Sequence, residues 1–148
     1  FEELKTLMIK FNVKALVIDA LPETRKVREL IADNVSRVWA CFYSEHQKGS
    51  YDWNEEERIV KVNRTESLDD GQETMLKAKV SLPQRDKMIE EFALHCSNIV
   101  KVADEDKETG EKRYVYKKLG PDHFRHAYNY AKIALSRSSK TSTFAVTR

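Results

Sequence analysis

The feature that most constrains the fold of this chain is a short run of apolar residues, 15–18, that ends at Asp19. A run that is apolar at every position is typical of a strand buried on both faces in a parallel or mixed sheet. A second strand is predicted over 37–43, and a helix predicted over 22–33, with Pro22 at its first position, lies between the two. Two parallel strands joined by a helix place the chain in the α/β class.

Apolar periodicity predicts the elements of the rest of the chain. Residues 44–57 are polar and are expected to form a loop. Helices are expected over 1–11, within 63–70, over 88–99 and over 122–136, and strands over 58–62, 78–82, 100–103 and 114–116, the last two as a hairpin. The side chains expected to face the core include Leu68, Met75, Leu76, the stripe Met88, Ile89, Phe92, Ala93, Cys96 and Ile99, and, in the last helix, Phe124, Ala127, Ala131 and Ala134.

The length of the chain limits the number of its domains, and its charge limits the classes of partner that it can bind. Its 148 residues suffice for one domain with a core, which we expect over 1–136, followed by a basic, Ser/Thr-rich flexible tail over 137–148. Lys and Arg number 26 against 24 Asp and Glu, and the net charge of +2 excludes a basic field over the whole molecule. Two distant cysteines predict a reducing cytosol, and the short apolar runs predict no membrane segment.

Two acidic residues stand where catalytic carboxylates often lie. Asp19 ends the most apolar strand, at the edge where open α/β sheets bind their ligands. Asp122 opens the final predicted helix, directly after Gly120 and Pro121. The alternative for both is structural, because Asp is a favoured helix N-cap that satisfies backbone amides.

Three further residues are candidates for binding. His126 shares a helix face with Asp122 at i,i+4 spacing, which can bring both to one metal ion, and the alternative is a surface or capping histidine. Lys61 and Arg64 alternate with apolar residues on and after the predicted strand 58–62. They fit a strip that faces DNA phosphates, with a solvated strand face as the alternative. No Gly-rich phosphate loop occurs, so the sequence holds no ATPase motor.

Several sequence blocks, taken in order, are similar to those of one protein family. They are 16–23 (LVIDALPE), 62–69 (VNRTESLD), 82–83 (LP), 92–95 (FALH) and 122–131 (DHFRHAYNYA). Together these blocks resemble the C-terminal nuclease domain of bacteriophage terminase large subunits, the packaging motors that cut concatemeric DNA to load capsids. The resemblance spans about residues 1–135.

The resemblance implies a fold, an activity and partners. The fold is ribonuclease H-like, a mixed sheet flanked by helices. The activity is endonucleolytic cutting of double-stranded DNA by a two-metal mechanism, with Mg²⁺ or Mn²⁺ as the two divalent cations. Asp19 and Asp122 match the family's metal-binding acids and would be catalytic. Partners would be double-stranded DNA and a portal or other terminase subunits, in the cytoplasm of an infected or lysogenic bacterial host.

The resemblance also implies that part of the fold is missing. In the family, the first metal-binding acid lies on the first strand of a three-stranded meander that would precede residues 1–11. Glu23, Glu66 and Asp69 are nearby acids, but nothing in the sequence fixes their direction. We therefore expect an N-terminally truncated nuclease that cuts DNA poorly or not at all.

Loss of the meander would leave the strand at 15–18 without one neighbour. An open apolar edge predicts one of three outcomes: a homo-oligomer that forms through this edge, pairing of the edge by another segment such as 58–62, or limited stability. The alternative function is a docking module in which the nuclease fold is only a scaffold. In that case the tail over 137–148 and one face of the domain bind a portal or another protein.

Overall fold

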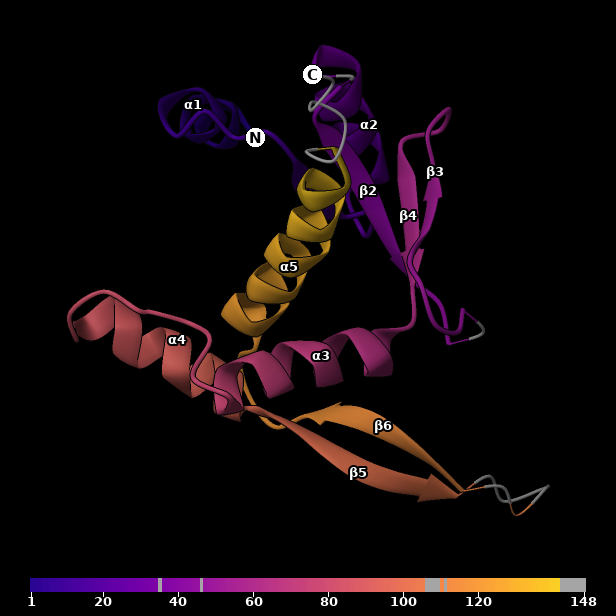
Figure 1. Cartoon of the computed structure of the whole chain (residues 1–148), viewed down its shortest axis with the longest axis vertical. Coiled ribbons are helices and arrows are strands. Elements are labelled where there is room, and N and C mark those ends of the chain that lie inside the picture. Colours follow the sequence, from indigo (N-terminus) through magenta and orange to yellow (C-terminus); the bar gives the residue numbers. More distant parts are fainter. Residues whose placement is uncertain (35, 46, 106–109, 111, 142–148) are drawn as a thin grey trace, which may run out of the picture. The chain divides into compact units, whose positions relative to one another are not determined.

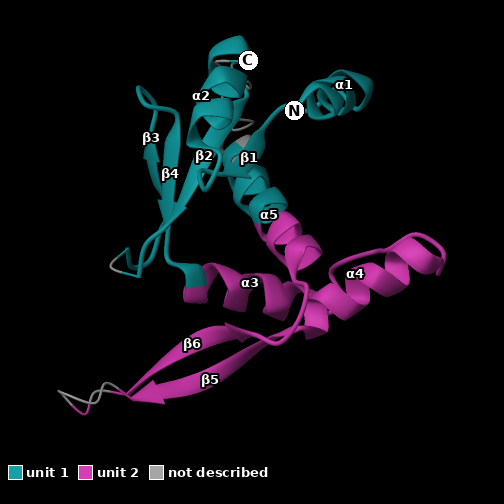
Figure 2. Ribbon diagram, turned by 180° about the vertical axis from the view of Figure 1, so that it is seen from behind, with its two compact units in different colours: residues 1–64, 130–148 teal, residues 65–129 magenta. Residues whose placement is uncertain are grey.

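The computed structural model describes residues 1–34, 36–45, 47–105, 110 and 112–141 (Figure 1). This described part of the chain is a mixed α/β structure with five helices, a mixed sheet of four strands and a sheet of two strands. It divides into two compact units, one formed by residues 1–64 with the chain from 130, the other by residues 65–129 (Figure 2). We describe each unit separately.

The first unit is built on a sheet with the strand order β1-β2-β4-β3. Its strands are β1 (Leu16–Asp19), β2 (Val38–Tyr43), β4 (Ile59–Val62) and β3 (Asp52–Asn54). β1, β2 and β4 run parallel, and β3 is antiparallel to β4. The carboxyl ends of the three parallel strands therefore meet at one edge of the sheet, where Asp19 is in register with Cys41 and Tyr43 with Val62.

Helices cover both faces of this sheet, because alternate side chains of each strand point to opposite faces. On one face, α5 (His123–Thr141) contributes Ile133 and Ala134 to a core with Val17, Trp39, Cys41, Val60 and Val62. On the other face lie α1 (Glu2–Lys10) and α2 (Thr24–Asp33). The clusters on that face are Met8, Leu30 and Val38, and Ala20, Val27 and Ala40.

An aromatic cluster holds the C-terminal part of α5 to the sheet. The rings of Trp39 and Trp53 meet edge to face, with 4.9 Å between centroids and 89° between planes. The guanidinium of Arg58 lies 4.9 Å from the Trp39 ring, and that of Arg137, on α5, lies 5.2 Å from the same ring and 5.8 Å from Trp53. Both arginines also pair with the Glu55 carboxylate. Cation–π contacts of this kind add to the hydrophobic packing of the helix.

The second unit combines helices with a hairpin. Its elements are α3 (Arg64–Leu76) from Thr65 onward, α4 (Lys87–Ser97), the antiparallel strands β5 (Ile99–Glu105) and β6 (Lys112–Lys118), and the first turns of α5. Its buried apolar cluster consists of only Leu68, Ile99 and Tyr116. Buried polar side chains accompany it: Ser67, His95, Asp122, Arg125 and Asn129. Hydrogen bonds of these buried polar side chains therefore contribute to holding this unit together.

The predictions for the first unit are largely confirmed, with three corrections. The expected helices and parallel strands all form. α2 begins at Thr24 and not at Pro22, since the Thr24 hydroxyl donates to the Ala20 carbonyl oxygen at 3.0 Å and closes the turn before the helix. The predicted loop over 44–57 contains β3. Pairing of β1 by 58–62 is wrong, because β4 pairs with β2, so β1 is an edge of the described sheet.

In the second unit the hairpin is confirmed, but several predictions of inward-facing residues are wrong. α3 extends to Leu76, whose side chain is 76% exposed, and no strand forms over 78–82, all of which the structure describes. On α4, Met88 and Ala93 are exposed and His95 is buried. On α5, Ala127 is exposed and Arg125 is buried, because the guanidinium finds hydrogen-bond acceptors inside the unit.

The C-terminal half of the last helix differs from the prediction in the exposure of one residue and in the position of the helix end. Ala131 is exposed, whereas Ala134 is buried as expected. α5 continues through Thr141, so the first five residues of the predicted tail, 137–141, are helical, and the remainder of that tail, 142–148, lies outside the described residues. No helix in the described chain combines the length and the apolar character needed to cross a membrane.

The packing of α5 on the sheet gives a first prediction. Ile133 is 0% exposed, whereas Leu135, on the same helix, is 65% exposed. We expect Ile133→Ala to lower the free energy of unfolding of the first unit by about 2–4 kcal/mol, because it leaves a cavity against Val60 and Val62. Urea unfolding followed by circular dichroism measures this change. Leu135→Ala is the matched control and should change stability by less than about 0.5 kcal/mol; equal effects of the two substitutions would contradict the packing described.

Candidate functional site

Asp19 lies at the carboxyl end of β1, at the edge where open α/β sheets commonly bind ligands. Its side chain is exposed, and its Oδ1 accepts a hydrogen bond from the backbone N–H of Leu21 at 3.1 Å. The next residue, Ala20, is buried and donates its backbone N–H to the Cys41 carbonyl oxygen at 3.0 Å. The strand therefore ends with its main chain anchored to β2 and one carboxylate directed away from the core.

Two tyrosines stand beside Asp19. The Tyr130 ring, from α5, stacks on the Tyr43 ring at the end of β2, with 5.7 Å between centroids and 25° between planes. Tyr130 also has hydrogen bonds with Tyr43 and with Asp19. Burial, together with these two neighbours, raises the pKa of the Tyr130 phenol far above its usual value, so this hydroxyl stays protonated. It therefore acts as a neutral hydrogen-bond donor to the Asp19 carboxylate.

Neither cysteine is suited to nucleophilic chemistry. Burial, and to a lesser extent the charge of Asp19, raises the pKa of the Cys41 thiol to about 12. Burial also raises the pKa of Cys96. Because the thiolate is the nucleophile and the metal ligand, both residues are inert packing groups at neutral pH.

Asp122, in the second unit, precedes α5 and is only 5% exposed. Its Oδ1 lies 3.0 Å from the Lys118 ammonium and its Oδ2 lies 3.4 Å from Nε2 of His126. Burial by itself favours the neutral acid, but the hydrogen bond from Lys118 and the charges of His126 and Lys118 outweigh it, so the pKa of Asp122 lies below its usual value. The predicted proximity of Asp122 and His126 is confirmed, and the carboxylate is ionised at neutral pH.

The N-terminus of α5 is capped by a residue that the sequence did not single out. Nδ1 of His95, on α4, accepts the backbone N–H of Phe124 at 3.2 Å. An imidazole nitrogen that accepts a hydrogen bond carries no proton, so Nδ1 is the unprotonated nitrogen of the His95 ring. His95 therefore takes the part of an N-cap acceptor, and the Asp122 side chain is left to pair with cations.

A buried arginine organises the interior of the second unit. Arg125 is 0% exposed, and its Nη2 donates to the Leu68 carbonyl oxygen at 2.6 Å. Gly71 makes room for it, since a Cβ at that position would lie 3.2 Å from Arg125 Nη1. One turn further along α5, Nδ2 of Asn129 donates to the Ser67 hydroxyl at 3.0 Å. α5 is thus fastened to α3 by polar contacts.

Asp69, one of the acids near the expected site, belongs to this polar interior. Its Oδ1 accepts the Tyr116 hydroxyl at 2.9 Å and its Oδ2 lies 2.6 Å from the Lys101 ammonium. Burial and the contacts with Asp69 raise the pKa of Tyr116 to about 12, and Arg125 forms a further hydrogen bond with the same tyrosine. Glu66 is exposed on α3, and Glu23 is exposed as the residue that precedes α2.

The two predicted phosphate contacts lie on different elements. Lys61 is an exposed residue of β4, in register with the exposed Asp52 of β3. Arg64 is the first residue of α3 and is half-buried, so it is not part of the strand. Lys61 and Arg64 therefore do not lie on one strand, because the chain changes from strand to helix between them.

The candidate metal ligands are distributed over both units. Asp19 belongs to the first unit, and Asp122 and His126 belong to the second. Within the described ranges, no three His, Cys, Asp or Glu side chains are grouped so that they could hold one metal ion. Each unit therefore supplies one of the two predicted metal-binding aspartates. The sequence analysis did not predict their neighbours, Tyr130 beside Asp19 and Lys118 beside Asp122.

Comparisons of this chain with protein-family models, with curated proteins and with solved structures gave no match.

The buried arginine gives a second prediction. Arg125→Met keeps most of the side-chain volume but leaves the buried Leu68 carbonyl without its donor. We expect this to destabilise the second unit by about 1–3 kcal/mol. Amide hydrogen exchange in α3 measures the change. Arg113→Met removes an exposed cation whose Nε lies 3.7 Å from Asp104 and should cost less than about 1 kcal/mol; exchange rates that respond equally to both substitutions would show that Arg125 has no special role.

The lowered pKa of Asp122 gives a third prediction. A carboxylate with a lowered folded pKa stabilises the fold above its unfolded pKa of about 4, and this stabilisation is lost as the pH falls through the lower folded value. We therefore expect the free energy of unfolding to fall less steeply from about pH 5 to pH 3 in Asp122→Asn than in the unchanged protein. Urea unfolding across this pH range measures the slope. The exposed Asp52→Asn serves as control, and identical slopes for all three proteins would contradict the prediction.

Proposed function

We propose that this chain is part of a metal-dependent DNA endonuclease of the terminase type, which cuts concatemeric double-stranded DNA during packaging. In this proposal the ribonuclease H-like fold of that family underlies the mixed α/β architecture. Two findings support it: the order of the sequence blocks, and the end of a parallel strand at an exposed carboxylate. The second finding, Asp19 at the carboxyl end of β1, carries the proposal.

Asp19 has the properties of a ligand for a hard cation. Its carboxylate is exposed, and the Leu21 N–H and the Tyr130 hydroxyl hold its orientation. Mg²⁺ and Mn²⁺ prefer carboxylate oxygens, and a cation fixed at this edge would bind the phosphate of DNA and polarise the bond to be cut. The neutral phenol leaves the negative charge of Asp19 available to the cation.

Asp122 would be a second metal-binding carboxylate. It is ionised, it directly precedes the last helix, and His126 lies next to it. Lys118 and His126 now occupy the positions from which a cation would approach its two oxygens. A divalent ion would therefore have to displace the Lys118 ammonium, which gives Lys118 the role of a resident counter-charge in the absence of metal.

The residues of this chain fit a divalent centre only in part. Mg²⁺ takes six oxygen ligands and usually keeps several waters, so one or two carboxylates suffice only for weak binding. Among the described residues each unit provides a single candidate carboxylate. We therefore propose that the chain supplies two metal-binding acids, and that efficient cutting requires a further acid besides these two.

The proposal also includes DNA-contacting residues, protein partners and a cellular compartment. Lys61 and Arg64 would contact the DNA backbone separately, from β4 and from α3. A portal or other terminase subunits would present the DNA, and the reaction would take place in the cytoplasm of the bacterial host. With a net charge of +2, the chain relies on such partners and not on a general attraction for nucleic acid.

A fourth prediction tests the proposal through metal binding. Titration of the chain with Mn²⁺, followed by electron paramagnetic resonance, should show weak binding that Asp19→Asn lowers by about 10-fold or more. Asp52→Asn, at an exposed carboxylate of the same unit, should leave the affinity unchanged. Supercoiled plasmid in Mn²⁺ should be nicked poorly or not at all by the 148-residue chain. Mn²⁺ binding that does not change in Asp19→Asn would contradict the proposal, and robust nicking by this chain would contradict the need for a further acid.

Cutting itself is tested in a chain joined to a segment that supplies the further acid. There Asp19→Asn and Asp122→Asn should each abolish cutting while circular dichroism stays unchanged. Unchanged cutting by Asp19→Asn would refute the nuclease assignment and leave the second candidate, a protein-docking module. An apolar hollow beside α2 favours that second function.

A further inference from the structure

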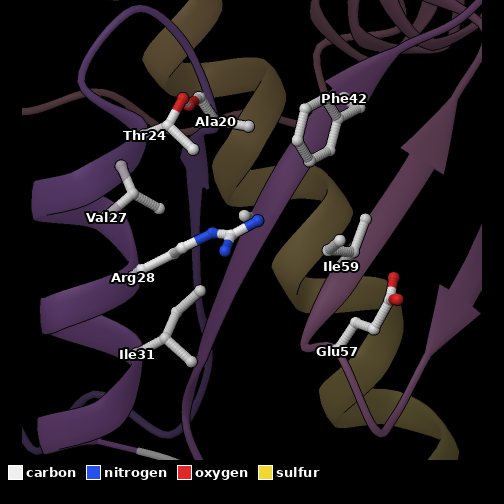
Figure 3. Close-up of a pocket in the computed structure, with 9 residues that line it drawn as sticks. Ala20, Thr24, Val27, Arg28, Ile31, Phe42, Glu57 and Ile59 are labelled. Atoms are coloured by element: carbon white, nitrogen blue, oxygen red, sulfur yellow. Dashed lines mark hydrogen bonds between the residues drawn. The ribbon is translucent and has the colours of Figure 1, made fainter.

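One half of the sheet face on the α2 side has no helix over it. Among its described residues, the connection between the parallel strands β2 and β4 runs through β3 without a helix, so α2 packs mainly over β1 and β2, and Ile59 of β4 packs at the border of that cluster. Phe42 and Ile59, which point to this face, are half-buried. Between them and α2 lies a hollow of about 330 Å³ whose lining is mainly apolar (Figure 3).

Opposite charges stand on the two walls of this hollow. Figure 3 shows the Arg28 guanidinium reaching from α2 across the hollow and the Glu57 carboxylate near Ile59 on the other side. No hydrogen bond or ion pair of either side chain occurs within the described chain. Beyond them, Lys61 is in register with Asp52. Cations and acids are thus balanced, which favours an occupant with one charge of each sign around an apolar centre.

α1 carries the complementary pattern on its outer side. Glu3, Leu7 and Lys10 are spaced so that they share one side of α1. Phe11, the C-cap residue directly after the helix, lies beside Lys10, whose ammonium is 5.4 Å from the Phe11 ring. Leu7 and Phe11 are 41% and 65% exposed, although Met8 of the same helix is buried in the core. Glu3 and Lys10 are exposed, and about 10 Å of helix separates them along its axis.

We infer that α1 of a second copy of this chain docks in the hollow. Leu7 and Phe11 of one copy would cover Phe42 and Ile59 of the other, with Glu3 against Arg28 and Lys10 against Glu57. Each contact joins a group that is exposed or half-buried in the single chain to a group of matching chemistry. This inference does not depend on the nuclease assignment, and it uses a surface other than the open edge of β1.

The inferred interface is small, so the affinity between the two copies is low. A single short helix buries less than the roughly 1,200 Å² at which stable complexes begin, so the association belongs to the weak, concentration-dependent class. The charge pairs lie at the rim and supply orientation more than affinity. The inferred contact therefore forms where local concentration is high, as it is for several copies gathered on one assembly.

Sedimentation velocity of the 148-residue chain gives the fifth prediction and tests the inference. The weight-average mass should rise between about 10 and 500 µM. Arg28→Glu alone and Glu3→Lys alone should each abolish the rise, because each places like charges opposite one another. The double variant, Arg28→Glu with Glu3→Lys, should restore it, since the pair is then reversed in sign.

Controls separate this contact from other association. Lys26→Glu, on another side of α2, and Leu76→Asp, at a 76% exposed leucine of the second unit, should leave the rise unchanged. Phe11→Asp should abolish it without changing circular dichroism. A constant monomer mass at all concentrations would overturn the inference. Association that persists in Arg28→Glu, or that the double variant fails to restore, would overturn it too and point to the β1 edge instead.

Discussion

The parallel pairing of β1, β2 and β4 is the constraint on which the first unit depends. Parallel strands carry apolar side chains on both faces, so both faces of the sheet need to be covered by helices. The sequence meets this need with α1 and α2 on one face and the C-terminal half of α5 on the other. The same parallel arrangement places every strand end at one edge, which is why an aspartate that merely ends a strand becomes a candidate ligand.

The second unit depends on a different kind of interaction. It has few buried apolar side chains, and its helices are joined through Arg125, Asn129 and His95 to backbone and hydroxyl partners. Each of these groups would be costly to bury alone and is tolerated because it is paired. Such a network is directional, so it fixes the rotation of α5 about its axis more strictly than apolar contacts would.

How far the sequence predicted the structure follows from what each signal encodes. The continuous apolar run 15–18 and the strand at 37–43 were predicted correctly, because burial on both faces leaves a local signature. The side of α5 that faces inward was not predicted correctly. Arg125 can be buried there because its guanidinium donates to the Leu68 carbonyl, and that acceptor comes from a distant part of the chain. β3 was missed because three residues carry no periodicity and form a strand only beside β4.

The same distinction applies to the candidate site. The position of Asp19 at a strand end and the neighbourhood of Asp122 and His126 follow from local spacing. The pairing of Asp19 with Tyr130 and of Asp122 with Lys118 required the folded chain. The metal ions, the DNA substrate and the membership of a packaging motor stay predictions that rest on the resemblance.

The edge-to-face contact of Trp39 and Trp53 has an optical consequence. The chain has only two tryptophans, both are in the first unit, and their rings lie 4.9 Å apart. Excitation can pass between indoles at this separation, and the guanidiniums of Arg58 and Arg137 polarise both excited states. Intrinsic tryptophan emission therefore reports on a single place, the seam between α5 and the sheet. The second unit has no tryptophan and therefore contributes nothing to this emission.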